Sequence, residues 1–476
     1  MRSSVALASL VLLANACQIY VGPAKPHHPA PEPPKATQEP ASDEDVVVEV
    51  FQTRKKPGAT AMMRAASQWL AAPSDGASGE LKIQFLDVGQ GDTTLITCPD
   101  GHVILVDVGG SESLTAAVPP AEMKVGGGDE TAKADAARKA IEDELDGKPL
   151  HALFVTHPDR DHYNGLGSVL TAKADQIYLG GKLSEYKASP AKEWLTQNAK
   201  AIQPSLERNL PKVQCGTAKL SAFVASPSAI DSLPKAVRRN AGSIVLVISQ
   251  GEADFVLTGD IVAQAKQDIL TQLGKDAPQI LESEVLKLAH HGADNGLLED
   301  WFGKVKPSIA IVSSRAEHRY GHPRQKVVDA VFSHLESAKK HSLWFHDGKK
   351  CKEQDDIDDD LVIECDESNW HRKDVEKAIY GTADAGPIVM TTKGETITVA
   401  YSKKKPKKTE EPKPKNKSER DPCMRRCPNL ACGTKVLSDR FGDRYAVSCF
   451  AFESEEYKKC IGKNLPGREI WEQCTK

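Results

Sequence analysis

Four side chains of the kinds that bind metal ions lie within six consecutive residues of this chain: His157, Asp159, Asp161 and His162. The apolar residues 152–155 before them predict a short buried strand, and the Asn164-Gly165 turn after them predicts a loop. Without a cation, imidazoles and carboxylates spaced so closely would repel one another or make no specific interaction, whereas one or two divalent ions satisfy all four. The alternative is a solvated polar turn that binds no metal.

Three segments of the chain resemble the metallo-β-lactamase superfamily. Residues 157–162 (HPDRDH) resemble its HxHxDH signature in the HxDxDH form of the ComEC-type competence proteins, with Asp159 in place of the middle histidine. Residues 83–93 (IQFLDVGQGDT) resemble the FxDVGQGD opening of that subfamily, and residues 104–110 (ILVDVGG) resemble the superfamily's first motif. The similarity extends from Leu81 to Tyr401 and implies an α/β fold, a four-layer αββα metallo-β-lactamase sandwich.

Two aspartates in these segments are candidates for supporting a metal site without binding the metal. Asp107, at a predicted strand end before Gly109-Gly110, resembles the superfamily position that supports the metal loop from behind. The alternative for Asp107 is an ordinary turn at the end of a strand. Asp92 could orient a metal ligand through its carboxylate.

Two later strand ends resemble the remaining ligand motifs. Residues 254–260 (DFVLTGD) resemble the LTGD motif, whose carboxylate bridges two metals in the superfamily, and this implies Asp260 as a ligand. Residues 285–292 (VLKLAHHG) resemble the final HHG motif. Because adjacent side chains of a strand point to opposite faces, we expect only one of these histidines to bind metal. We prefer His291, which precedes glycine, and assign His290 to the surrounding shell or to proton transfer.

The third histidine of a di-zinc β-lactamase site has no candidate, because no histidine lies between His162 and His290. Asn240 resembles the family's NxxS element at about this place, and we assign it to substrate binding. Asparagine is a poorer ligand than imidazole, so one of two metal sites would be weak or filled by water. The predicted ligands are rich in carboxylate oxygen, which makes manganese or iron a competitor to zinc.

Residues 319–323 (RYGHP) resemble another segment of the family. His322, together with Arg319, could bind a substrate phosphate or protonate a leaving oxygen. The structural alternative is that His322 caps a helix that begins near Arg324. Both interpretations remain open.

The first residues predict export. Met1-Arg2 and the apolar residues 5–13 form a signal peptide over residues 1–16, too short to span a bilayer. Cys17 directly follows Ala14-Asn15-Ala16, so we expect its lipidation and anchoring in a bacterial cell envelope, with secretion as the alternative. Residues 17–45 read as a Pro-rich tether, and residues 46–80 as an N-terminal extension with a helix at residues 60–71.

Eleven cysteines after an export signal indicate an oxidising compartment. In the hydrolase domain, residues 81–402, Cys351 and Cys365 are the most local pair. A Lys/Pro linker at residues 403–421, predicted to be disordered, leads to residues 422–476, whose six cysteines predict a small disulfide-rich module, with zinc as the alternative. This module could bind a cell-envelope partner or merely stabilise the end of the chain.

The resemblance therefore implies an exported metal-dependent hydrolase, most of all a phosphodiesterase or nuclease that acts through a metal-activated water. Its substrate would be DNA or a phosphocholine-type ester, and its cofactor one or two ions of zinc, manganese or iron. Net charge is only −4, so no global field attracts nucleic acid. Alternatives are a non-catalytic surface binding protein with a structural metal and a β-lactam or amide hydrolase; DNA uptake would need a separate membrane channel. The catalytic candidates are Asp161, His290 and His322.

Overall fold

The computed structural model describes residues 46–54, 79–111, 128–204, 213–355, 361–402, 435–438 and 444–447. The predicted signal peptide, Cys17, the tether, the helix at residues 60–71 and the Lys/Pro linker lie outside these residues. Of the cysteine-rich segment, only an antiparallel pair of strands is described, β19 (Lys435–Ser438) and β20 (Arg444–Val447).

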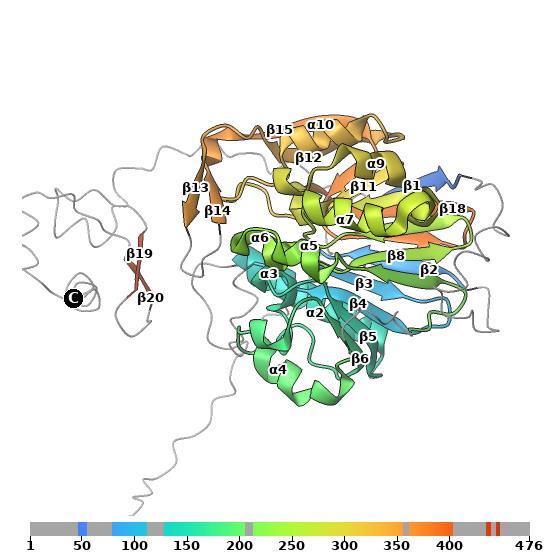
Figure 1. The fold of residues 1–476 in the computed structure, drawn as a ribbon, viewed down its shortest axis with the longest axis horizontal. Coiled ribbons are helices and arrows are strands. Elements are labelled where there is room, and N and C mark those ends of the chain that lie inside the picture. Colours follow the sequence, from blue (N-terminus) through green and yellow to red (C-terminus); the bar gives the residue numbers. More distant parts are fainter. Residues whose placement is uncertain are drawn as a thin grey trace, which may run out of the picture. The chain divides into compact units, whose positions relative to one another are not determined.

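Two β-sheets form the centre of the fold (Figure 1). In spatial order, the eight strands of the first sheet are β1 (Val46–Gln52), β18 (Thr396–Ser402), β17 (Ile388–Thr392), β2 (Leu81–Phe85), β3 (Thr93–Thr97), β4 (Val103–Val108), β5 (Leu150–Val155) and β6 (Ala174–Leu179). The six strands of the second sheet are β16 (Ile379–Gly381), β11 (Ile309–Val312), β10 (Val285–Lys287), β9 (Ala253–Leu257), β8 (Val245–Gln250) and β7 (Lys219–Phe223).

Strand alternation divides the apolar residues between two faces of each sheet. In β5, Ala152 and Phe154 belong to the core between the sheets, which also contains Phe255 of β9. Leu153 and Val155 of the same strand point outward into a second core. The inner faces of the two sheets therefore pack against each other, and each outer face needs a cover.

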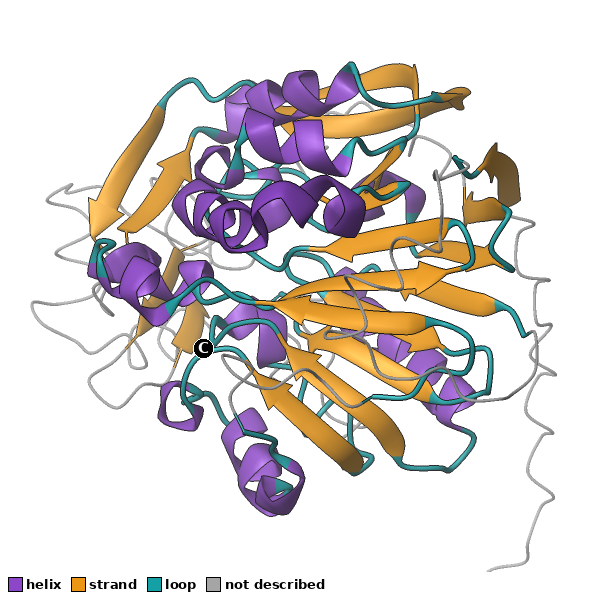
Figure 2. Cartoon of the chain, turned by 45° about the vertical axis from the view of Figure 1, so that its right-hand side comes forward, coloured by secondary structure: helices purple, strands orange, loops and turns teal. Residues whose placement is uncertain are grey.

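Helices cover both outer faces (Figure 2). On the first sheet, the apolar side of α2 (Gly128–Leu145) and of α4 (Ala191–Gln197) packs on the outward residues of β5. On the second sheet, Trp301 of α9 (Glu299–Val305) packs among residues of α7 (Ala263–Leu273) and α10 (Gln325–Phe332). These four layers confirm the predicted αββα sandwich.

The remaining elements are short or lie beside the sheets. The helices are α3 (Arg160–Tyr163), α5 (Pro227–Asp231), α6 (Lys235–Ala241), α8 (Ala277–Leu281) and α11 (Thr382–Ala385). The 3₁₀ helices are η3 (Leu183–Glu185), η4 (Ala199–Ala201), η5 (Gly274–Asp276), η6 (Ala289–Gly292), η7 (Asp294–Gly296) and η8 (Glu367–Asn369). Two antiparallel pairs complete the fold: β12 (Ser337–His346) with β15 (Trp370–Lys377), and β13 (Cys351–Asp355) with β14 (Leu361–Cys365). Within the described part of the chain, no helix has the length and apolarity needed to cross a membrane.

Two disulfides link described residues. Cys351 bonds to Cys365 across β13 and β14, which confirms the predicted local pair. Cys98 bonds to Cys215, 117 residues further along the chain, a pairing that the sequence did not indicate.

Candidate metal centre

The ends of strands in both sheets bring the predicted ligands together. The loop after β5 carries His157 to His162, the turn after β9 carries Asp260, and η6 after β10 carries the two adjacent histidines. Strands β9 and β10 are parallel, as are β4 and β5, so their carboxyl ends lie at the same edge of each sheet. Segments separated by about a hundred residues in the sequence thus contribute to one cluster.

A single oxygen atom, Asp260 Oδ2, lies within 4 Å of four imidazole nitrogens. Its distances to the Nε2 atoms of His162 and His291 are 3.2 and 3.4 Å. Its distances to the Nε2 atoms of His290 and His157 are 3.8 and 3.9 Å. The carboxylate of Asp260 therefore occupies the centre of the cluster, and its bridging of two ions stays a prediction.

Two further carboxylates flank this centre. Asp159 Oδ2 lies 3.3 Å from the Nε2 atom of His157, and Asp161 Oδ2 lies 3.2 Å from the Nε2 atom of His291. Donors bound at about 2.1 Å to one tetrahedral ion are about 3.4 Å apart, which is close to these separations. The donor set and its spacing therefore fit one or two divalent ions.

The hydrogen bonds of the histidines favour metal binding through Nε2. His162 Nδ1 lies 2.8 Å from Asp107 Oδ2, and His291 Nδ1 lies 2.7 Å from the Ser313 carbonyl oxygen, so both nitrogens must donate. Thr156 donates its hydroxyl proton to Asp107, so its oxygen can accept from His157 Nδ1 at 3.1 Å.

Each ring consequently directs its Nε2 atom into the cluster. The Nε2 atoms of His157, His162 and His291 are buried and make no hydrogen bond within the described residues. Buried polar atoms normally have partners, and a metal ion would satisfy all three. This observation, independent of any motif, supports the fit of a metal.

The electrostatics of the cluster also favour a cation. Burial opposes ionisation of Asp260, yet His162 and His291 hold the pKa of its carboxyl well below the usual range. Burial disfavours a charged His162, yet Asp260 and Asp107 raise its pKa well above the ordinary value. Against the effect of burial, Asp260 and Asp92 raise the pKa of His291 to about 10. The carboxylates thus hold protons on the rings, which a divalent ion would displace.

Asp107 supports the metal loop through three hydrogen bonds. In addition to the bonds from His162 and the Thr156 hydroxyl, its Oδ1 accepts from the Thr156 backbone N–H at 2.7 Å. Asp107 has a φ of 59°, a strained conformation for a residue other than glycine. The predicted supporting position of Asp107 therefore matches its contacts.

The glycine of the first motif permits a close approach of two loops. A Cβ atom on Gly109 would lie 2.0 Å from the carbonyl oxygen of Asp161, inside van der Waals contact. The same carbonyl accepts a hydrogen bond from the Asp92 N–H at 3.0 Å. The segments around Asp92 and Gly109 thereby fix the backbone of the metal loop.

The two adjacent histidines do not follow the alternation that the sequence suggested. Strand β10 ends at Lys287, and His290 and His291 lie in η6 with φ values of 50° and 54°. His290 Nδ1 lies 2.7 Å from Asn295 Oδ1, and its Nε2 faces Asp260. The assumed strand alternation was therefore wrong, because the chain turns after β10, whereas the expectation that only one of the two histidines binds metal stays a prediction.

Arg239, which the sequence analysis missed, lies at the edge of the cluster. Its Nε is 2.9 Å from Asp159 Oδ1, and about a third of its side chain is exposed. Asn240, the next residue of α6, is buried. The predicted role of Asn240 in substrate binding stays a prediction. The sequence did contain a signal for Arg239, because this basic residue directly precedes Asn240, the first residue of the NxxS element.

His322 lies beside the cluster and does not cap a helix. Its ring is 5.3 Å from that of His290, it is buried, and its Nδ1 has no hydrogen-bond partner among the described residues. The N-cap of α10 is Arg324, without a side-chain capping bond, so the capping interpretation was wrong. Arg319 donates to the Tyr320 hydroxyl at 2.8 Å, and its role in phosphate binding stays a prediction.

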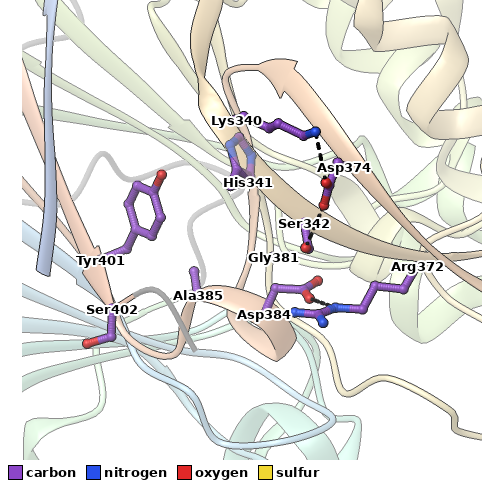
Figure 3. A pocket seen from close by; sticks show the side chains of 10 residues that line it. All are labelled: Lys340, His341, Ser342, Arg372, Asp374, Gly381, Asp384, Ala385, Tyr401 and Ser402. Carbon is purple, nitrogen blue, oxygen red and sulfur yellow. Dashed lines mark hydrogen bonds and ion pairs between the residues drawn. The ribbon is translucent and has the colours of Figure 1, made fainter. Parts of the chain in front are cut away.

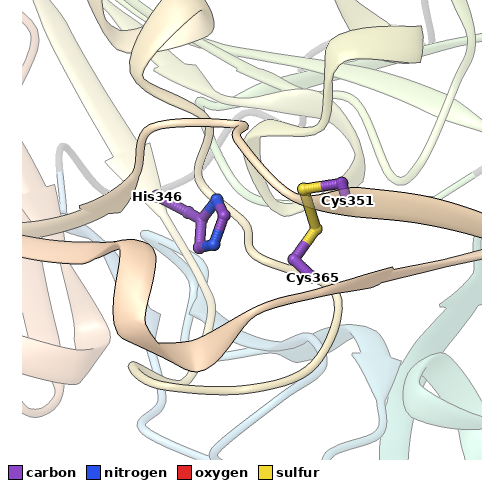
Figure 4. Close-up of side chains that lie close together, drawn as sticks. All are labelled: His346, Cys351 and Cys365. Carbon is purple, nitrogen blue, oxygen red and sulfur yellow. A yellow bond between two sulfur atoms is a disulfide. The ribbon is translucent and has the colours of Figure 1, made fainter.

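Two other places in the fold gather polar or sulfur-containing side chains. His346 lies close to Cys351 and Cys365, but these sulfurs form a disulfide and offer no thiolate to a metal (Figure 4). A pocket at β12 and β15 contains the ion pairs Arg372–Asp384 and Lys340–Asp374 (Figure 3). None of the clustered histidines and aspartates lines this pocket.

Comparisons with known proteins agree with the motifs. Residues 86–313 match the Metallo-beta-lactamase superfamily. The chain is 28% identical over 262 residues to ComE operon protein 3 from Bacillus subtilis (strain 168), 26% over 252 residues to Recombination protein 2 from Haemophilus influenzae, and 22% over 259 residues to Competence protein ComA from Neisseria gonorrhoeae. These alignments cover 54%, 52% and 54% of this chain, but only 31%, 26% and 30% of the relatives.

The chain also aligns with a solved structure, a metallo-beta-lactamase mutant from Cronobacter sakazakii, at 11% identity and a TM-score of 0.24. That alignment covers 46% of this chain and 79% of the other. Residues 86–313 are a metallo-beta-lactamase domain, and their similarity to the three relatives confirms the ComEC-type resemblance. This domain supports a metal-dependent hydrolase and implies divalent metal ions.

Proposed function

We propose that this protein is a metal-dependent phosphodiesterase or nuclease. The observation that carries the proposal is the position of Asp260 Oδ2, within 4 Å of four imidazole Nε2 atoms. A cluster of this kind serves hydrolysis when it holds an ion beside a place for water and substrate.

The predicted ligands divide around Asp260 into two groups. His157 and Asp159 lie on one side, His291 and Asp161 lie on the other, and His162 lies close to Asp260. These six residues would hold one or two ions of zinc, manganese or iron, with His290 as a seventh donor. A bound ion supplies Lewis acidity toward the substrate and toward the attacking water.

Other residues of this chain would orient the substrate and move protons. The guanidinium of Arg239 is partly exposed next to Asp159 and would attract an anionic substrate. Burial, and then the neighbouring His290, lower the pKa of His322 well below its ordinary value. His322 would therefore be neutral, and the protonated form needed to donate a proton to a leaving oxygen is disfavoured.

The relatives favour a DNA substrate over a phosphocholine-type ester. Two of their names refer to recombination and to competence, and the chain aligns with about a third of their length or less. For this chain we propose only the hydrolytic reaction. Any part in DNA uptake would depend on a separate membrane channel.

The decisive experiment combines metal analysis with a panel of substrates. The purified protein is stripped of metal, reloaded with zinc, manganese or iron, and assayed with bis-p-nitrophenyl phosphate, DNA, p-nitrophenyl phosphorylcholine and nitrocefin. We expect cleavage of phosphodiesters that the variant Asp161→Ala lacks. A protein that binds metal but cleaves nothing would instead be the non-catalytic binding protein.

A β-lactam or amide hydrolase remains the second candidate, on one specific observation. The sequence argued against it because a third histidine was missing, but His290 reaches the cluster and supplies another imidazole. Turnover of nitrocefin without cleavage of phosphodiesters would favour this candidate.

We also propose that the protein is exported and anchored by a lipid on Cys17, with the cysteine-rich segment available to a cell-envelope partner. The apolar residues 5–13 and the small residues before Cys17 support this proposal. Labelling of cells with a fatty acid analogue tests it. Label should appear on the wild-type protein and not on Cys17→Ala, whereas unlabelled protein in the medium would indicate secretion.

A further inference from the structure

A buried cation lies directly behind the metal cluster. Lys287 is the last residue of β10 and only 2% exposed. Its Nζ atom lies 2.5 Å from Asp92 Oδ2, and the Asp92 side chain is equally buried. Burial disfavours an ammonium group, yet Asp92, Asp260 and Asp107 raise the pKa of Lys287 above its ordinary value. The pair is therefore a buried ion pair.

The Asp92 carboxylate has no evident task in orienting the histidines. Its oxygens are 3.7 Å from His162 Nδ1 and 3.6 Å from His291 Nδ1, beyond good hydrogen-bond distance. Those two nitrogens already donate, to Asp107 and to the Ser313 carbonyl. The shortest contact of the Asp92 carboxylate within the described residues is the one with Lys287.

The same carboxylate lies within reach of a metal ion. Asp92, Asp260 and His291 offer ligand atoms that are all within 4.8 Å of one another. A carboxylate in this place would add a ligand to the ion held by the other two residues. Whether Asp92 coordinates the metal therefore depends on which group holds its carboxylate.

We propose that Lys287 is a positioning residue that holds the Asp92 carboxylate out of the coordination sphere and so limits the number of ligands. The ammonium engages Asp92 Oδ2 and balances one of the buried negative charges behind the cluster. A site kept short of ligands retains open positions for water and substrate. This proposal rests on the metal centre of the proposed function.

The test is the visible spectrum of bound Co²⁺, which reports the number of ligands and does not require activity. In Lys287→Met, the Asp92 carboxylate loses its counter-ion and becomes a ligand. We expect the absorption per bound Co²⁺ to fall about twofold, because added ligands move the ion away from tetrahedral geometry. In the double variant Lys287→Met with Asp92→Asn, the spectrum should return to that of the wild type.

Lys266→Met is a matched control. Lys266 is also 2% exposed, but its Nζ donates to the carbonyl of Gly296 and not to a carboxylate. This variant loses a buried lysine amine without releasing a potential ligand. Its Co²⁺ spectrum should equal that of the wild type.

The outcomes separate this proposal from the proposed function. A wild-type protein that binds no Co²⁺ overturns the metal centre and this proposal with it. A wild-type protein that binds Co²⁺, with an unchanged spectrum in Lys287→Met, overturns only the role of Lys287. If Lys287→Met does not fold, Asp92→Asn decides: a wild-type spectrum and stoichiometry support the proposal, and the loss of an ion or an altered spectrum overturns it.

Discussion

Asp107 and His162 are joined by a hydrogen bond of 2.8 Å, although 55 residues separate them in the sequence. Asp107 is the penultimate residue of β4, and His162 lies in α3, shortly after β5, the parallel neighbour of β4. The bond fixes which ring nitrogen of His162 carries the proton and turns Nε2 toward Asp260. A carboxylate that orients a metal-binding imidazole in this way also raises its basicity.

We expect Asp107→Asn to weaken metal binding. The amide cannot accept hydrogen bonds at both of its terminal atoms, so either Thr156 or His162 loses its partner. Loss of such a supporting group typically lowers metal affinity by about 10- to 100-fold. Competition with a chromophoric chelator measures the affinity.

The control for this substitution is Asp143→Asn. Asp143 is exposed on α2 and pairs with Lys139, away from the described cluster. Its metal affinity should remain that of the wild type. Equal affinity of Asp107→Asn and the wild type would mean that the loop holds His162 without help from Asp107.

We expect Asp260→Asn to lower the number of bound ions and to abolish most of the activity. The substitution removes the negative charge that faces four imidazoles. A loss of several kcal/mol of transition-state stabilisation corresponds to a decrease of roughly a thousandfold in kcat/KM. Elemental analysis and the hydrolysis of bis-p-nitrophenyl phosphate measure the two effects, and retention of wild-type metal content would contradict the bridging role.

Much of the fold and the site could be predicted because the information is local. An apolar strand followed within three residues by a carboxylate or an imidazole identified the positions of His157 and Asp260. Residues 152–155 and 254–257 were expected as strands and lie in β5 and β9. The roles of these side chains as ligands remain predictions.

What the sequence could not reveal depends on contacts between distant segments. The ion pair of Lys287 with Asp92 joins two strand ends, and a lysine in an apolar run gives no sign of its partner. Cys98 and Cys215 are 117 residues apart, so their pairing depends on the complete fold. His290 and His291 have positive φ values because the chain turns in η6. The apolar run before them predicted a strand and gave no sign of this turn.

The two described disulfides should contribute unequally to stability. Removing Cys98–Cys215 releases a loop of 117 residues, whereas removing Cys351–Cys365 releases one of 14. Loop-closure entropy predicts losses of about 5 and about 3 kcal/mol in the free energy of unfolding. Unfolding of the two double serine variants in urea measures the difference. A larger loss for the Cys351–Cys365 variant would show that strain or packing, and not loop length, dominates.

Lys266 should make the stability of the protein depend on pH. Burial, and then the charge of Lys287, lower the pKa of Lys266 to about 7. The unfolded chain, with an ordinary lysine, binds the proton more tightly than the folded chain between pH 7 and about 10. The free energy of unfolding should therefore rise with pH over this range, by roughly 2 kcal/mol between pH 7 and pH 9.

The comparison with Lys266→Met isolates this contribution, because the variant keeps all other titrating groups. As the pH rises from 7 to 9, the free energy of unfolding of the wild type should increase by roughly 2 kcal/mol relative to that of the variant. Urea unfolding at several pH values measures it. A difference that does not change with pH would mean that the Gly296 carbonyl and the ring of Trp301, whose centroid is 5.6 Å from Nζ, keep the ammonium charged throughout.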